Sequence, residues 1–189
     1  MAYNSKAIAN YFLDIAEKEG DTSITPMKVQ KLVYYAHGWH LAIYGRPLIH
    51  EQIEAWKYGP VIESLFHTFK IYGKDQITEK AKRYQFPEVQ PGEDVNDLLE
   101  NVRVYEPSLE DDENTDEDPS ETAVFLDQVW EIYGKYSGTR LSNMTHTPGS
   151  PWSVVSEKYE GDPPKGTDIP REIIEEYFTK MGSTAEASH

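Results

Sequence analysis

The sequence predicts a mainly α-helical fold, with about six to seven helices in one compact domain, a small β-ribbon and an acidic insertion. Apolar residues recur at the period of an amphipathic helix over most of the chain. Residues that favour helix starts precede these segments, and glycine often follows them. The 189 residues are enough for one sizeable hydrophobic core. We therefore place residues 1–181 in a single helical domain and residues 182–189 in a flexible tail.

The longest apolar-periodic run, Thr25–Tyr44, is expected to form a central helix. Thr25 can cap its N-terminus, and Pro26 suits the first helical position because its missing N–H needs no partner there. Gly45 is placed to end the helix. The apolar stripe consists of Val29, Leu32, Val33, Ala36, His40 and Ile43.

Shorter segments with the same period predict the other helices. A first helix begins at Asn4 or Ser5 and ends near Gly20. Pro60 is expected to open a helix that stops at Gly73. Further elements are expected as follows: extended pieces near Leu48 and at Ile53–Tyr58 that form a ribbon, a helix from the capping-box sequence Asp118–Glu121 to about Gly138, and helices at Leu141–Thr145, at Trp152–Tyr159 and from about Pro170.

Acidity is concentrated in one stretch of the chain. Fourteen of the 33 acidic residues, but only Arg103 among the 18 basic ones, lie between Tyr84 and Glu121, so this stretch carries −13 of the net charge of −15. Its prolines, its block of like charge and its few apolar anchors are typical of a solvated segment. Residues 84–120 are therefore interpreted as an acidic, partly disordered insertion, with a short helix or strand expected only at Asp94–Val104.

Composition and charge exclude several classes of function. The chain has no cysteine, which rules out disulfides, thiolate zinc sites and a cysteine nucleophile and suits the cytoplasm. Neither a signal peptide nor an apolar run of the roughly 20 residues that span a bilayer is visible. The acidic balance disfavours contact with nucleic acid and favours a basic protein partner. We expect a cytoplasmic protein without direct nucleic-acid or membrane contact.

Two histidines are candidates for a metal site. His37 and His40 lie three residues apart on the central helix, a spacing that can present two imidazoles to one metal, and His146 is a further candidate. They belong to no known metal motif, and the usual nucleophile and phosphate-binding motifs are absent. A histidine on a nearly all-apolar helix is usually packed in the core. No catalytic, cofactor or metal residue is assigned and no cofactor is expected, while a metal-dependent enzyme using His37 and His40 is kept as the less favoured alternative.

Two stretches resemble one known family. Lys28–Gly73, which reads KVQKLVYYAHGWHLAIYGRPLIHEQIEAWKYGPVIESLFHTFKIYG, is similar to the opening signature of the Panacea domain, a phage-associated protein family. Leu141–Trp152, LSNMTHTPGSPW, resembles its second signature, in which a Thr-His pair precedes a Pro-Trp pair. The two motifs occur in the right order and at a suitable separation.

The resemblance implies a helical domain that acts as an antitoxin. A type II-like antitoxin of this kind would bind and neutralise a protein toxin encoded by an adjacent gene, and it would not be an enzyme. One branch of the family delivers its toxin to a protease, so a proteolytic adaptor is the alternative that the resemblance leaves open.

The resemblance also directs attention to two sets of residues. The partner-binding candidates are Trp56, Lys57, Tyr58, Gly59 and Pro60, because they combine aromatic and basic side chains in a turn-rich part of the first signature. The residues expected to be structural are Trp39, His40, Thr145, His146 and Trp152. The acidic stretch is expected to steer a basic partner toward the helical body.

Overall fold

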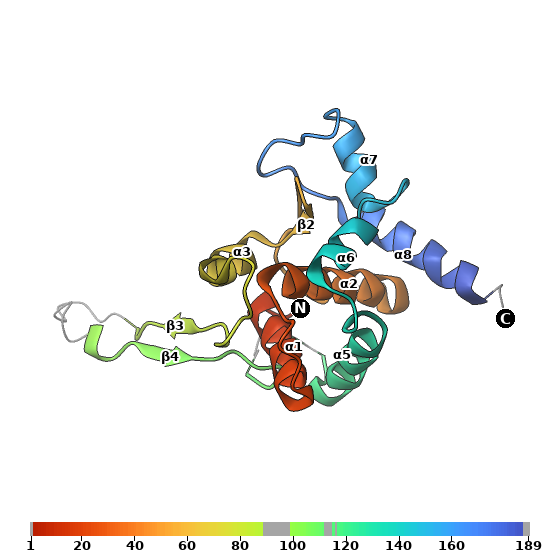
Figure 1. Cartoon of the computed structure of the whole chain (residues 1–189). Helices are drawn as coiled ribbons and strands as arrows, with labels where there is room; N and C mark the ends of the chain where they lie inside the picture. The colour runs from red at the N-terminus through yellow and green to blue at the C-terminus, as the bar shows by residue number, and fades with distance from the viewer. Residues whose placement is uncertain (1, 89–98, 112–114, 116, 187–189) are drawn as a thin grey trace.

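The computed structural model describes residues 2–88, 99–111, 115 and 117–186, and it confirms a mainly α-helical fold (Figure 1). In these residues the helices are α1 (Ser5–Glu19), α2 (Pro26–Tyr44), α3 (Glu63–Phe69), α5 (Pro119–Tyr133), α6 (Gly138–Met144), α7 (Pro151–Glu157) and α8 (Arg171–Glu186), with a 3-10 turn at Lys70–Tyr72. Two antiparallel pairs are formed by β1 (Glu54–Trp56) with β2 (Gly59–Val61) and by β3 (Arg83–Gln85) with β4 (Arg103–Tyr105).

Helix α2 lies at the centre, as its sequence predicted. The Thr25 hydroxyl accepts a hydrogen bond from the Lys28 amide, Pro26 occupies the first turn, and Gly45 ends the helix with φ +66°. Helices α1, α5, α6 and α8 all pack on α2, which Figure 1 shows in the middle of the helical body. Because these neighbours surround it, most of its polar residues are buried, whereas Ile43, expected in the apolar stripe, and Tyr44 are exposed in its last turn.

The contact between α2 and α8 depends on Gly38. A Cβ atom at this position would overlap the Phe178 ring, so glycine is what lets the two helices approach this closely. The neighbouring Trp39 packs edge-to-face on the same ring, with centroids 5.4 Å apart, and its Nε1 donates to the Tyr133 hydroxyl at 2.8 Å. Trp39 therefore ties α2 to both α5 and α8.

Pro60 does not open a helix, which corrects the sequence prediction. It lies in β2 opposite Ala55, and α3 begins only at Glu63. A proline is tolerated there because it needs no N–H in a short two-stranded ribbon. The expected extended piece near Leu48 makes an isolated bridge between Tyr3 and Ile49 instead of pairing with β1.

The acidic insertion contains a second ribbon, β3–β4, which projects from the helical body in Figure 1. Its return leg has an apolar anchor that the sequence analysis missed, because Leu109 is buried in the core. Part of the element expected at Asp94–Val104 lies outside the described residues, and its last two residues belong to β4.

The C-terminal ends of two predicted helices, α5 and α8, shift in the structure. Helix α5 begins as the capping-box sequence predicted, with Asp118 accepting from the Ser120 amide at 2.8 Å, but it ends at Tyr133, ahead of Gly138. Helix α8 continues to Glu186, into the segment expected as a tail. In the described part of the chain, no helix is both long and apolar enough to cross a membrane.

Candidate functional site

The partner-binding candidates form one hairpin. Trp56 pairs with Gly59 across a tight turn made by Lys57 and Tyr58, and Pro60 follows on the second strand. Gly59 has φ +97°, a backbone conformation that side chains rarely adopt. The sequence therefore makes the turn possible, but two strands this short are not stable by themselves in water.

Side chains from the second signature hold the hairpin by its main chain. The Trp152 indole donates to the Trp56 carbonyl at 2.7 Å, and the Ser142 hydroxyl donates to the Tyr58 carbonyl at 2.8 Å. His146 lies between two carbonyl oxygens, with Nδ1 2.7 Å from that of Ser142 and Nε2 3.4 Å from that of Lys57. Three consecutive carbonyl groups of the turn thus face polar side chains from α6, α7 and the segment between them.

Side chains of helix α2 bind the main chain of β2 and of the residue after it. Lys31 Nζ donates to the Pro60 carbonyl at 2.9 Å, and the Gln30 side chain exchanges two hydrogen bonds with the main chain of Ile62, at 2.9 and 3.0 Å. Lys31 is fully buried, and this burial lowers its pKa to about 7. We call Gln30, Lys31, Ser142, His146 and Trp152 the clamp.

Gly59 and Thr145 meet inside the clamp. A Cβ atom at Gly59 would lie 2.5 Å from Thr145 Oγ1 and 2.9 Å from Lys31 Nζ, so no larger residue fits. The Thr145 hydroxyl itself donates to the Ser142 carbonyl at 2.7 Å. Gly59 and Pro60 are buried, and they shape the turn without offering side-chain surface.

The outer side of the hairpin is aromatic and cationic. Tyr58 is 61% exposed and Lys57 is also exposed, with its ammonium 5.8 Å from the Tyr58 ring centroid. The half-buried Trp56 ring lies 4.8 Å from the exposed Phe66 ring of α3, and Lys165 Nζ lies 5.8 Å from the Trp56 ring. We call Trp56, Lys57, Tyr58, Phe66 and Lys165 the hairpin surface.

Two members of the hairpin surface were not found from the sequence. Phe66 fits the apolar period of α3, which is typical of a buried residue, but it is 37% exposed. Lys165 comes from the loop before α8, where nothing local indicates that its ammonium reaches Trp56 and Glu63 (2.8 Å to Oε1). Only the tertiary fold brings them together.

His40 lies in a different part of the molecule. Its Nδ1 is 2.8 Å from the Arg46 carbonyl oxygen, and its ring packs against Phe125 of α5 with centroids 5.5 Å apart. Glu117, near the end of the acidic insertion, approaches Nε2 of His40 at 3.8 Å and binds Arg46 at 2.7 Å. The contacts of Trp39 and His40 described above join helices to one another, and none of them involves the hairpin surface.

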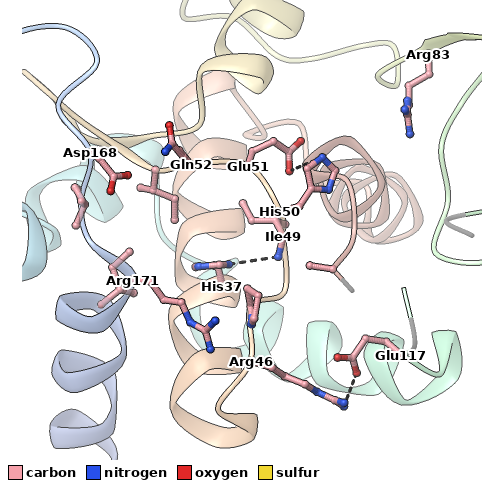
Figure 2. Close-up of a pocket in the computed structure, with 15 residues that line it drawn as sticks. His37, Arg46, Ile49, His50, Glu51, Gln52, Arg83, Glu117, Asp168 and Arg171 are labelled. Carbon is pink, nitrogen blue, oxygen red and sulfur yellow. Dashed lines mark hydrogen bonds and ion pairs between the residues drawn. The ribbon is translucent and has the colours of Figure 1, made fainter. Parts of the chain in front are cut away.

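A cleft of about 810 Å³ opens beside α2 (Figure 2). His37 lies at its inner wall and accepts a hydrogen bond from the Ile49 amide through Nδ1 at 3.4 Å. Burial, with a smaller effect of His40 and Arg171, lowers the pKa of His37 to about 3, so its imidazole is neutral. Both signs of charge line the rim, where Arg46 is paired with Glu117 and His50 lies 3.8 Å from Glu51.

The three histidines considered for a metal site do not converge. His37 faces Ile49, His40 faces Arg46 and His146 faces Ser142. Among the described residues, no group of three histidine or carboxylate side chains is arranged to hold a metal ion.

The fold and the clamp together define a helical domain in which two distant sequence motifs meet around one hairpin. The chain matches the family "Antitoxin SocA-like, Panacea domain" over residues 29–153, a region that contains every residue of the clamp, and it belongs to that family. It is similar to the antitoxin SocA of Caulobacter vibrioides (strain NA1000 / CB15N), with 29% identity over 153 residues, which cover 81% of this chain and 70% of the relative. No solved structure matches the chain.

Proposed function

We propose that this chain is an antitoxin that neutralises a protein toxin, encoded by an adjacent gene, by binding it directly through the hairpin surface. In this proposal the system is type II-like, the protein acts in the cytoplasm, and no catalysis is involved. Membership of an antitoxin family and the similarity to an antitoxin support the role. The observation that supports the site is the rigid display of exposed Lys57 and Tyr58 beside Trp56 and Phe66.

Such a surface has the composition of an interface core. Aromatic side chains bury a large area at a small cost in conformational entropy, and they dominate the binding energy of many interfaces. The clamp lowers the cost further, because the turn carbonyls are already fixed before a partner arrives. Lys57 adds positive charge at the edge of the aromatic patch, which favours a carboxylate on the partner, whereas the Lys165 ammonium is paired with Glu63.

The metal-dependent alternative has less support. Each of the three candidate imidazoles faces a main-chain group of the fold, and no group of three histidine or carboxylate side chains among the described residues is arranged to hold a metal ion.

A growth-rescue assay with the adjacent gene product tests the proposal. The variant Lys57→Glu/Tyr58→Ala should fail to rescue growth while keeping its fold. The chain offers a matched control in Lys158→Glu/Tyr159→Ala, because this second Lys-Tyr pair is also exposed but lies at the end of α7. Equal rescue by the two variants would refute the assignment of the site.

The same assay separates binding from delivery to a protease. In the proposed mechanism the amount of toxin protein stays constant while growth is rescued. A fall in toxin that depends on the antitoxin would instead favour the proteolytic adaptor, with a protease as an additional partner.

A further inference from the structure

The β3–β4 ribbon is a second surface that is exposed among the described residues. We call β3, β4 and Phe86, the residue after β3, the arm. Tyr84 is 64% exposed, Phe86 66% and Val104 53%, although apolar side chains of this size are usually buried. From its sequence this acidic stretch is expected only to steer a partner, but the structure adds large exposed apolar side chains to it.

The apolar side chains of the arm share one face. Tyr84 is the cross-strand partner of Val104, and Phe86 follows two residues after Tyr84, so alternation places all three on the same side of the ribbon. The opposite face carries two pairs, Arg83 with Tyr105 and Gln85 with Arg103, and is mostly polar. The arm is therefore amphipathic, with an apolar face that meets solvent.

The root of the arm is fixed to the helical body by one buried amide. Asn10 of α1 accepts a hydrogen bond from the Ala81 amide at 2.7 Å and donates to the Ala81 and Pro107 carbonyls, both at 3.0 Å. It therefore holds together the segment that leads into the arm, at Ala81, and the segment that leads back from it, at Pro107. Leu109 on the returning leg is buried in the core. The position of the arm is set at its base, whereas its apolar face stays exposed among the residues that the structure describes.

The charge of the acidic stretch indicates which class of partner suits this apolar face. A two-stranded ribbon alone is at best marginally stable in water, so its apolar face gains most from an external partner. The stretch from Tyr84 to Glu121 carries a charge of −13, which repels a second copy of the same stretch and nucleic acid and attracts a basic protein. The exposed carboxylates closest in sequence to the arm are Glu88, Glu100 and Glu106.

We propose that the arm is a second docking surface, which binds a basic and partly apolar region of the same toxin that the hairpin surface binds. This inference rests on the proposed function, because it takes its partner from there. The apolar face supplies contact area and the surrounding carboxylates supply attraction. Two separate contacts on one partner strengthen binding, since the second forms at a high effective concentration once the first exists.

The test compares variants of the full chain in binding to the purified protein encoded by the adjacent gene. Tyr84→Ser/Phe86→Ser removes the apolar face and keeps the charge. Glu88→Gln/Glu100→Gln/Glu106→Gln removes charge and keeps the apolar face. The matched control is Val124→Ser/Ile132→Ser, because these residues of α5 are 60% and 52% exposed and lie outside both surfaces.

We expect the apolar variant to weaken the Kd at least about tenfold, the usual effect of removing an interface anchor. The control should stay within about twofold, as substitutions outside an interface do. The charge variant should lower the on-rate at low salt and reduce the salt dependence of binding. Hydrogen exchange should show slower exchange at the amides of Arg103–Tyr105 in the complex than in the free chain. If the serine substitutions unfold the ribbon in the free chain, the charge variant and the exchange data decide.

The outcomes separate this inference from the proposed function. A wild-type chain that binds the toxin and rescues growth, with arm variants that bind equally well, would refute the arm and leave the hairpin surface standing. The arm would also be refuted if the toxin is acidic and the charge variant binds it with the same salt dependence as the wild-type chain. A wild-type chain that neither binds nor rescues would overturn the proposed function and the arm together.

Discussion

The buried Lys31 predicts an unusual pH dependence of stability. Burial lowers its pKa from 10.5 to about 7, whereas the unfolded chain should titrate near the ordinary value. Between these values the unfolded state binds more protons than the folded state, so the free energy of unfolding rises with pH. A shift of this size corresponds to about 5 kcal/mol over the whole window, at about 1.4 kcal/mol per pH unit.

Replacing Lys31 with methionine should remove this dependence. Methionine has a similar shape, and the loss of the 2.9 Å bond to the Pro60 carbonyl adds a cost that does not vary with pH. We expect the free energy of unfolding of the wild-type chain to rise by about 3 kcal/mol relative to Lys31→Met between about pH 7 and pH 9.5. Buried tyrosines such as Tyr34 titrate in both proteins and cancel in the difference.

Urea denaturation at several pH values measures the difference. Lys158→Met serves as the control, because Lys158 is an exposed lysine and its removal should give a line parallel to the wild type. Parallel lines for Lys31→Met as well would refute the reasoning. They would mean that the ammonium stays charged inside the fold, with the Pro60 carbonyl oxygen as its partner.

Three further changes test the packing. The buried imidazole of His37 has a pKa of about 3, so between about pH 6.5 and pH 4 only the unfolded state takes up a proton at this residue. Over this range the wild type should lose about 3 kcal/mol of its free energy of unfolding relative to His37→Gln, and acid denaturation of both proteins measures the difference. Trp39→Ala should cost about 3 kcal/mol in urea denaturation, and an unchanged melting temperature with lost toxin binding would make Trp39 an interface residue instead. Gly59→Ala should cost about 1 to 3 kcal/mol more than Gly161→Ala, which shares a positive φ (+89°) but has open space around it; equal losses would show that the contact with Thr145 is not limiting.

The sequence predicted elements whose signals are local. Thr25, Pro26 and Gly45 marked both ends of α2 correctly, because caps and proline act within one turn of the helix. Pro60 misled the analysis, because a proline suits both a helix start and a short strand, and the choice depends on its distant partners Ala55 and Lys31.

The missing parts of the site are tertiary for the same reason. Leu109 is a single apolar residue in an acidic stretch and creates no period, yet it anchors the insertion in the core. The partners of the hairpin, such as Ser142 and Lys165, lie more than 80 residues along the chain. The resemblance named the two motifs that matter, but only the structure shows that one of them holds the other.

The way the clamp holds the hairpin leads to a last prediction. Trp152 and Ser142 bind the carbonyls of Trp56 and Tyr58, and main-chain carbonyls are present whatever the side chain. The outward side chains can therefore change without breaking a clamp bond. We expect Lys57→Glu/Tyr58→Ala to cost no more than about 0.5 kcal/mol of stability, as most surface substitutions do.

Trp152→Phe should behave in the opposite way. It keeps an aromatic ring beside His146 but removes the N–H that reaches the Trp56 carbonyl at 2.7 Å, and the loss of this hydrogen bond should cost about 1 kcal/mol. Urea denaturation of the two variants measures both values. Equal losses would contradict the view that the clamp alone holds the hairpin, because they would show that Lys57 and Tyr58 also hold it in place. The expected result would mean that the hairpin surface can be altered toward a different toxin while the fold that presents it stays the same.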